Sequence, residues 1–367
     1  MSPGGGAALG VMPLLTQLPL LLNTAVGFRL CPGNCLCYES SDSVDCRSRG
    51  LVQVPAVVPH DAWLLDVSGS KMTEVRTGSF TGLWSLRILL MSNSSIRTLQ
   101  PQSLSSLQFL ERLDLSFNRL RRLPGDFSRS LSSLRELRLD HNRLQRLDSA
   151  SLADSEDLRK LDLSYNRIRA LDVGGFSSLS RLSLLNLEAN RPNVLRDGVP
   201  SRQQSLEVLP LGRNNVSAIG AEAPAPLRSP ALLGLRGNQL THIKFETFLQ
   251  LQTTSTNLQM SSNPWTCDCE LQRVFSKIQR VRHLHVEDYR DVVCHDPPAP
   301  HTHLAGGSLA SLDGGLCVVE TASMFVVTVT VVVAVIWTII KAERSSNNNN
   351  NNKKQSVSDA ESQSDEK

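Results

Sequence analysis

Cysteine is missing from the whole middle of this 367-residue chain. Four cysteines lie at residues 31, 35, 37 and 46, four more lie at 267, 269, 294 and 317, and the 220 residues between the two groups contain none. The spacings do not match the paired C-x2-C pattern of common zinc sites, so they favour disulfides over a metal. Two cysteine clusters around a cysteine-free middle suggest a repetitive body whose two ends are held by disulfide bonds.

Net charge and catalytic motifs are scarce as well. A formal net charge of +3 gives the whole chain no general affinity for nucleic acid. The sequence has no nucleophile elbow, no glycine loop of the phosphate-binding type and no H-E-x-x-H motif. We therefore expect a protein that is not an enzyme, with no catalytic residues, no metal ligands and no cofactor.

Two long apolar runs are present, one near each end. Residues 7–22 are apolar and are followed by small residues, which indicates a signal peptide over 1–27 that is cut near Gly27. Residues 321–340 contain no charge and, as a helix of about 30 Å, are long enough to cross a membrane. Because Lys341 and Arg344 follow this run, we expect a single-pass type I protein of the plasma membrane, with its N-terminus outside and a disordered cytoplasmic tail over 341–367.

The cysteine-free middle is a repeat with a period of 24 residues. Seven in-phase segments share a leucine-rich pattern that ends around asparagine: "LRILLMSNSSI" at 86, "LERLDLSFNRL" at 110, "LRELRLDHNRL" at 134, "LRKLDLSYNRI" at 158, "LSLLNLEANRP" at 182, "LEVLPLGRNNV" at 206 and "PALLGLRGNQL" at 230. A degenerate copy starts at 62, and a last copy starts at 255 after a step of 25. One unit cannot cover its own leucines, so neighbouring units must stack into a continuous core.

The pattern L-x-x-L-x-L-x-x-N-x-L assigns a place to each residue type. Its leucines should face inward from a short strand, and its asparagines should stack and bond backbone groups where the chain turns. Four phenylalanines at a late position should fill the convex side: Phe80, Phe127, Phe176 and Phe248.

These residues resemble the extracellular, 24-residue class of leucine-rich-repeat proteins. "CPGNCLCYESSDSVDCRSRGLVQVP" at 31–55 and "NPWTCDCELQ" at 263–272 resemble the cysteine-rich caps of that family. The resemblance implies a solenoid with parallel strands on its concave face and an irregular convex side, over residues 62–262, with caps over 28–61 and 263–318. It also implies four bridges: Cys31–Cys37, Cys35–Cys46, Cys267–Cys294 and Cys269–Cys317. Trp265 replaces a repeat leucine and should cover the open end of the core.

An aromatic strip occurs at the eighth place of the repeats. Phe117, His141 and Tyr165 occupy this place in three consecutive repeats, and adjacent strands of a sheet lie about 4.8 Å apart. The strip is a candidate partner-binding site, with simple self-stacking as the alternative. At the third and fifth places, charges alternate in sign from repeat to repeat, which favours a ladder of ion pairs across the strands.

Arginines recur just beyond the asparagines. They occupy the tenth, twelfth and thirteenth places and should stack along one edge: Arg97, Arg119, Arg121, Arg122, Arg143, Arg146, Arg167, Arg169 and Arg191. Such an edge should attract a polyanion, and heparan sulfate is the candidate on a cell surface. The alternative is a row of solvated side chains.

Two sequons and one proline complete the candidate features. Asn93 and Asn215 each begin an N-x-S sequence and are expected to be glycosylated. Pro210 falls within a predicted strand, where it can donate no hydrogen bond, so a local bend or a tolerated irregularity is expected there.

The sequence favours a cell-surface recognition protein of the adhesion or co-receptor type. Its partner would be an extracellular protein or a glycan. The alternative is an auxiliary subunit that modulates a channel or receptor in the same membrane.

Overall fold

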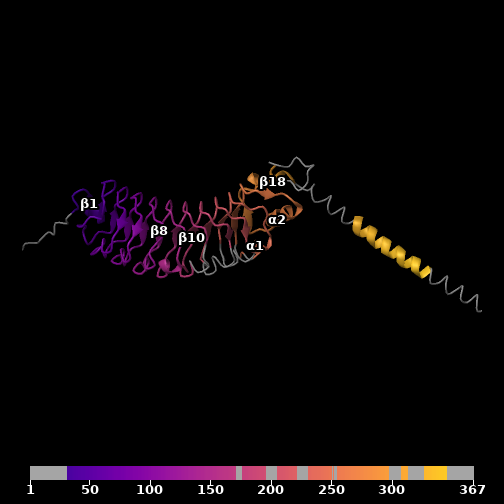
Figure 1. Ribbon diagram of the computed structural model, residues 1–367, viewed down its shortest axis with the longest axis horizontal. Helices are drawn as coiled ribbons and strands as arrows, with labels where there is room; N and C mark the ends of the chain where they lie inside the picture. Colours follow the sequence, from indigo (N-terminus) through magenta and orange to yellow (C-terminus); the bar gives the residue numbers. More distant parts are fainter. Residues whose placement is uncertain are drawn as a thin grey trace, which may run out of the picture.

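The computed structural model describes residues 31–170, 176–195, 205–220, 230–249, 251, 254–296, 307–312 and 326–344. The expected signal peptide, residues 345–367 of the expected tail and Cys317 lie outside these ranges. The described residues between 31 and 312 form an elongated solenoid in which each 24-residue unit is one turn (Figure 1).

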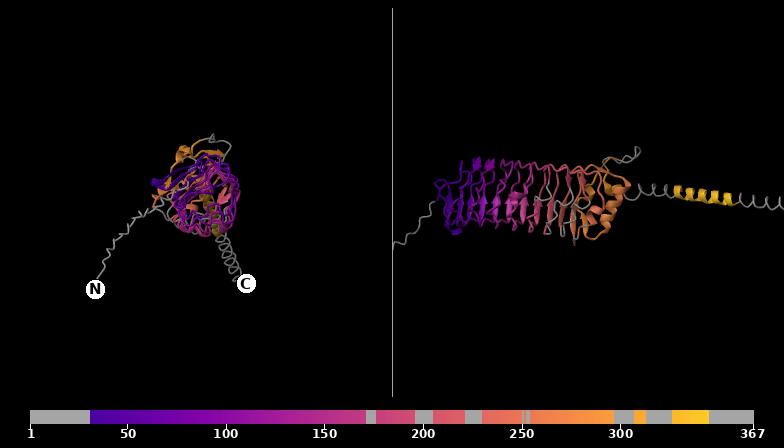
Figure 2. Two further views of the ribbon diagram at one scale, coloured as in Figure 1. Left: turned by 90° about the vertical axis from the view of Figure 1, so that its left-hand side faces the viewer. Right: turned by 60° about the horizontal axis from the view of Figure 1, so that its bottom comes forward.

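A single sheet of twelve strands runs the length of the described solenoid (Figure 2). Its order is β1-β2-β3-β5-β7-β8-β9-β10-β12-β14-β15-β17, and every neighbouring pair is parallel except β1 and β2. The strands are β1 (Leu36–Tyr38), β2 (Ser43–Asp45), β3 (Leu64–Asp66), β5 (Ile88–Leu90), β7 (Arg112–Asp114), β8 (Glu136–Arg138), β9 (Lys160–Asp162), β10 (Leu184–Asn186), β12 (Val208–Pro210), β14 (Leu232–Gly234), β15 (Thr256–Gln259) and β17 (Leu284–Val286).

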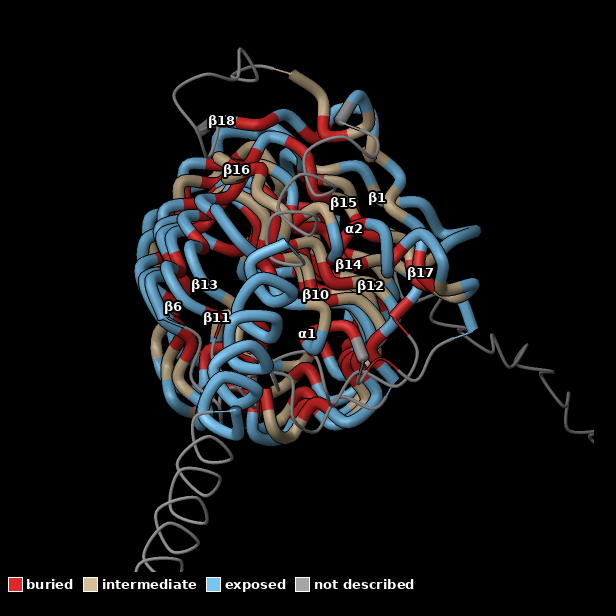
Figure 3. Tube along the Cα trace, turned by 90° about the vertical axis from the view of Figure 1, so that its right-hand side faces the viewer, coloured by how far each residue is buried: buried red, intermediate tan, exposed pale blue. Residues whose placement is uncertain are grey.

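The register of the sheet follows from the repeat. Leu113 pairs with Leu89 on one side and Leu137 on the other, so equivalent residues of successive turns lie side by side. All three leucines are fully buried, as are the residues at the first and sixth places of the same repeats, which are leucine except for Met91. Viewed along the solenoid, the buried residues fill its interior and the exposed ones form its outer surface (Figure 3). The expected leucine-rich-repeat solenoid is confirmed.

The convex side is built from turns and short elements. They include α1 (Glu246–Leu249), a 3-10 turn at Ser149–Leu152 and two small parallel sheets. These sheets pair β4 (Glu74–Val75) with β6 (Thr98–Leu99) and β11 (Val194–Leu195) with β13 (Ala218–Ile219). The four expected phenylalanines are all buried here, which explains how a side with so little regular structure is held: Phe80, Phe127, Phe176 and Phe248.

A ladder of buried side chains at the ninth place ties the turns together. Asn142 is typical: its Nδ2 donates to the carbonyls of Leu115 (2.9 Å) and Leu139 (3.1 Å), and its Oδ1 accepts from the amide of Leu120 (2.9 Å). Each asparagine therefore satisfies backbone groups of its own turn and of the previous one. The ladder begins with two buried serines and continues with asparagines: Ser70, Ser94, Asn118, Asn142, Asn166, Asn190, Asn214, Asn238 and Asn263.

The N-terminal cap covers the first turn. Its strands β1 and β2 form an antiparallel hairpin, and β2 pairs in parallel with β3, so the cap extends the sheet. Bridges Cys31–Cys37 and Cys35–Cys46 hold it, as the family resemblance implies.

The C-terminal cap covers the last turn. Trp265 lies in β16 (Trp265–Thr266), is fully buried, and donates its indole N–H to the carbonyl of Met260 at 2.9 Å. Helix α2 (Cys269–Arg280) begins at Asp268, which accepts a bond from the Leu271 amide, and packs Phe275 edge-on against the tryptophan. The expected end cover is therefore a tryptophan plus an amphipathic helix.

The expected bridges of this cap are visible in part. Cys267 and Cys294 are joined, and β16 pairs with β18 (Cys294–Asp296) beside them. Cys269 is also disulfide-bonded, but its expected partner, Cys317, lies outside the described residues. Among the residues that the structure describes, no cysteine is free.

Pro210 weakens the sheet on one side only. Strands β10 and β12 share a single paired position, Leu184 with Val208, whereas β9 and β10 share three. On the other side Pro210 pairs with Gly234, whose missing side chain leaves room, since a Cβ there would lie 3.3 Å from the Pro210 Cα. The strand survives because the proline still accepts a bond at its carbonyl, from the Leu187 amide.

One apolar helix lies beyond the solenoid in the sequence. It covers Val326–Arg344 and, by length and composition, could cross a membrane. The expected span began at residue 321, and residues 321–325 are outside the described ranges.

Candidate functional site

The eighth place of every repeat lies just past the carboxyl end of a strand, at what we call the strand-end edge of the sheet. Phe117, for example, follows the last residue of β7 by three positions. From the second repeat onward the place is occupied by Asn93, Phe117, His141, Tyr165, Ala189, Arg213, Gly237 and Ser262, and all have a φ between 51° and 69°. This left-handed conformation costs a bulky residue more than glycine or asparagine.

The glycines and the asparagine at the eighth place indicate this left-handed conformation in the sequence, but the repeat pattern of leucines did not predict it. Gly69, Asn93 and Gly237 occupy the same place, and glycine and asparagine are the residues that adopt the left-handed region most readily. The expectation that the eighth-place side chains are exposed holds for Phe117 and Tyr165, while His141 is half-buried between them.

Three rings form what we call the aromatic stack: Phe117, His141 and Tyr165. The ring centroids of Phe117 and His141 are 4.0 Å apart and those of His141 and Tyr165 are 4.3 Å apart, with interplanar angles of 12° and 10°. The rings are thus nearly parallel and stacked face to face.

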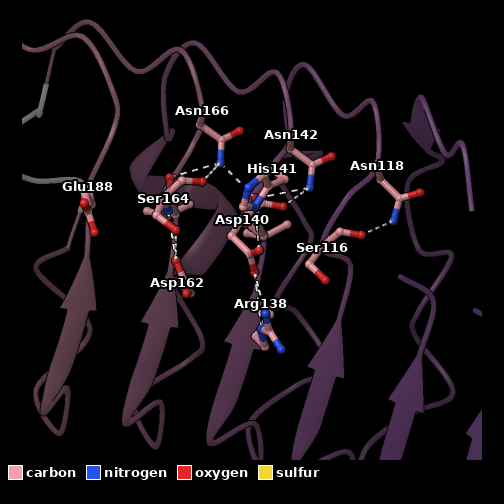
Figure 4. Close-up of polar contacts among 12 residues, drawn as sticks. Ser116, Asn118, Arg138, Asp140, His141, Asn142, Asp162, Ser164, Asn166 and Glu188 are labelled. Atoms are coloured by element: carbon pink, nitrogen blue, oxygen red, sulfur yellow. Dashed lines mark hydrogen bonds and ion pairs between the residues drawn. The ribbon is translucent and has the colours of Figure 1, made fainter. Parts of the chain in front are cut away.

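The middle ring is held in place by a buried acid. His141 Nδ1 lies 3.0 Å from Asp140 Oδ2, and Arg138 contacts the other oxygen of the same carboxylate at 3.3 Å (Figure 4). Burial of the Arg138 side chain opposes its charge, but the carboxylates of Asp140 and Asp114 outweigh this effect and raise the pKa of Arg138 above its usual value. The arginine therefore stays charged beside the Asp140 carboxylate that contacts the histidine.

The expected ladder of ion pairs is present in part. Arg138 lies 3.6 Å from Asp114 across the fifth place, and Arg112 lies 3.5 Å from Glu136 across the third. At Lys160, the next position of the third-place ladder, the described residues show no ion pair.

Six of the nine expected arginines line one surface groove of about 1060 Å³, which we call the arginine groove. It also contains Asp126 and Asp148, so its charged lining has six positive and two negative groups. Asp148 pairs with Arg146 at 3.2 Å, and Asp126 accepts the amide of Gln102 at 3.1 Å. The six arginines are all exposed: Arg97, Arg119, Arg121, Arg122, Arg143 and Arg146.

The other three arginines do not join the groove. Arg167, Arg169 and Arg191 are exposed on later turns but are not part of its lining. The groove thus gathers six of the nine expected arginines, over three turns. Because Arg119 follows Phe117 by two residues, the arginine groove and the aromatic stack lie on adjacent surfaces.

Both sequon asparagines are exposed. Asn93 precedes Phe117 in the eighth-place column, and Asn215 directly follows the buried Asn214. Their exposure leaves room for a glycan at either position.

Replacing Phe117 by glycine tests whether the stack is structural, because Phe117 contacts the His141 ring without taking part in the bond to the buried Asp140. Glycine would relieve the left-handed backbone by about 1 kcal/mol and would remove one ring contact worth about 0.5–1.5 kcal/mol. We therefore expect the free energy of unfolding, measured by denaturant titration of the full-length protein, to change by no more than about 1 kcal/mol. A much larger loss would show that the rings serve stability and would favour self-stacking alone.

Comparison with known proteins supports the fold and the repeat. The leucine rich repeat family model matches residues 64–120, 132–191 and 180–240. Leucine-rich repeat-containing protein 3 of Bos taurus is 38% identical over 106 residues, 28% of this chain and 41% of that protein. Decorin of Rattus norvegicus is 34% identical over 83 residues, 23% of this chain and 21% of decorin. The matched region therefore covers less than half the length of each of these two relatives.

A solved structure extends the similarity to the caps. Human 5T4 (Wnt-activated inhibitory factor 1, trophoblast glycoprotein) superposes with a TM-score of 0.59 at 22% identity, over 78% of this chain and 98% of the other. At this identity the likeness concerns the fold. Leucine-rich-repeat domains bind proteins and are generally non-enzymatic. With both caps and the repeat in place, the chain is a leucine-rich-repeat protein whose solenoid is closed by cysteine-rich caps and followed by one apolar helix.

Proposed function

We propose that this chain is a non-enzymatic cell-surface recognition protein, an adhesion molecule or co-receptor, that binds its partner at the strand-end edge. In this proposal the helix Val326–Arg344 anchors it in the plasma membrane with the solenoid outside. The observation that carries the proposal is the aromatic stack: three rings lie at exposed or half-exposed positions whose backbone favours glycine.

The energetics of these positions support binding rather than stability. A bulky residue in the left-handed region costs on the order of 1–3 kcal/mol, and one ring contact returns about 0.5–1.5 kcal/mol. The stack therefore gains little for the fold, while two aromatic side chains remain exposed to solvent. Rigid aromatic rings are the side chains that most often dominate protein interfaces.

The arginine groove supports a polyanion as a further partner. Its six exposed arginines lie on three consecutive turns. Neighbouring strands are about 4.8 Å apart, which is less than the Debye length of about 8 Å at physiological salt. The fields of the arginines therefore add, and only one of the six, Arg146, is paired with an acid among the described residues. On a cell surface, sulfated glycans such as heparan sulfate have the extended negative charge that this groove would recognise.

Proximity labelling in co-culture tests the proposed function. A labelling enzyme is fused to the full-length chain at Phe28, and the expressing cells are mixed with cells that lack the chain. We expect proteins of the apposed cells to be labelled above the level given by the enzyme on an unrelated span. Labelling confined to proteins of the expressing cell would instead support an auxiliary subunit that acts within one membrane.

A further inference from the structure

The eighth-place column loses its large side chain at Ala189. Phe117, His141 and Tyr165 fill three consecutive turns, Ala189 occupies the next, and Arg213 the one after. One face of the Tyr165 ring is therefore covered by His141, and the other is turned toward a position that has only a methyl group.

Arg213 reaches across this position. Its Nη1 donates to the hydroxyl of Tyr165 at 2.9 Å, although 48 residues, or two turns, separate the two residues. Its Nε lies 3.4 Å from Glu188, and its side chain remains 66% exposed. Exposed ion pairs of this kind are worth at most about 1 kcal/mol, so a partner can displace the guanidinium at little cost.

We propose that a partner protein inserts one aromatic side chain beside Ala189, against the Tyr165 ring, where it displaces the Arg213 guanidinium from the Tyr165 hydroxyl. This proposal rests on the proposed function and names the chemistry of its contact. The inserted ring would be the fourth layer of the aromatic stack, and the planar guanidinium of Arg213 would cover its outer face.

The spacing fits a single planar group. Two strand separations place the turns of Tyr165 and Arg213 about 9.6 Å apart, which is the room available once the Arg213 guanidinium leaves the Tyr165 hydroxyl. A ring in contact with a planar group on each side needs two separations of about 3.5–4.0 Å, or about 7–8 Å. A branched aliphatic side chain is thicker and would not stack on either face.

The charge of Arg213 distinguishes an aromatic ring from a cationic side chain. The free face of Tyr165 could attract either, because its ring carries negative charge density on its face. A second cation would be repelled by Arg213, whereas an uncharged ring is attracted by the tyrosine on one side and by the guanidinium on the other. The structure thus favours tryptophan, tyrosine or phenylalanine as the inserted residue.

Ala189→Phe is a variant that fills the space from within. It should fold, because phenylalanine already occupies the same column with the same backbone: φ is 55° at Phe117 and 54° at Ala189. Ala189→Gly is the matched control, since it leaves the space open in a conformation that glycine prefers. Tyr165→Ala is a second test variant that removes the ring face itself.

Saturation-transfer NMR on the full-length protein in lipid nanodiscs tests the proposal with three probes. They are N-acetyl-tryptophanamide, N-acetyl-leucinamide and N-acetyl-argininamide, and empty nanodiscs give the background. One ring contact of about 1 kcal/mol corresponds to about a fivefold difference in affinity. We expect the tryptophan signal to exceed the other two about fivefold, to fall about fivefold in Ala189→Phe and Tyr165→Ala, and to persist in Ala189→Gly.

Other outcomes overturn the proposal. An Ala189→Phe protein that binds the tryptophan probe as the unchanged protein does would show that the space is not used. A leucine or arginine probe that binds as strongly as tryptophan would show that the aromatic chemistry is wrong. No cell partner takes part in this experiment, so its result is independent of the co-culture labelling. The probes can fail to bind while cell-surface recognition holds, and the probes can bind while cell-surface recognition fails.

Discussion

Replacing Arg121, Arg122, Arg143 and Arg146 by glutamate is expected to lower the affinity of the protein for heparin about 100-fold. The four residues line the arginine groove and are exposed, so each can contact a sulfate group. If each contact contributes about 0.7 kcal/mol, their loss alone amounts to about 3 kcal/mol, or a factor of about 100, and the four new negative charges add repulsion. The measurement is surface plasmon resonance of the full-length protein in nanodiscs on immobilised heparin at physiological salt.

A control with the same change in charge separates the groove from net charge. Lys71, Arg159, Arg273 and Arg282 are exposed and lie outside the groove, and their replacement by glutamate changes the net charge equally. This control is expected to keep most of the affinity. If both variants lose affinity equally, or if the unchanged protein does not bind heparin at physiological salt, the arginines are a solvated surface and the polyanion proposal is wrong.

Replacing Asn142 by alanine is expected to destabilise the centre of the solenoid by at least about 3 kcal/mol. The amide group of Asn142 bonds four backbone groups, at Leu115, Leu120, Leu139 and Asp140, and is itself buried. Each buried backbone group left without a partner costs about 1–3 kcal/mol, and alanine replaces none of the four bonds. Hydrogen exchange of peptides from the turns on either side of Asn142 should become at least about 100-fold faster.

An exposed asparagine is the matched control for this stability prediction. Asn193 is exposed, and among the described residues its hydrogen bonds are those that its backbone carbonyl accepts from the amide and hydroxyl of Ser217. Its replacement by alanine should leave exchange nearly unchanged. Equal, small effects at both positions would mean that the asparagine ladder does not hold the turns together.

Much of the solenoid could be predicted because its contacts repeat with the sequence. A leucine at every twenty-fourth residue, as at Leu89, Leu113 and Leu137, can be buried only if successive turns pair in register, and the structure shows this register. The same holds for the asparagine ladder. The bridges of the N-terminal cap, in contrast, were implied by family resemblance and not by spacing.

The candidate site was predicted less completely because it depends on local geometry. The order of Phe117, His141 and Tyr165 followed from the repeat, but their left-handed backbone and the buried Asp140 that orients the middle ring did not. Likewise, the repeat predicted nine arginines along one edge, but it did not predict that six of them line a groove. The sequence placed Ala189 in the eighth-place column, but it did not predict that the Arg213 side chain reaches past Ala189 to Tyr165.

The most direct test of recognition at the strand-end edge is proximity labelling with an edge variant. This variant combines glycine at Phe117, His141 and Tyr165 with the four glutamate substitutions in the arginine groove, in the full-length chain on cells. Its surface level is first matched to that of the unchanged protein. Our account predicts that proteins of apposed cells labelled by the unchanged chain are lost with the edge variant, while neighbours within the same membrane remain. The same set of labelled proteins for both chains would contradict it.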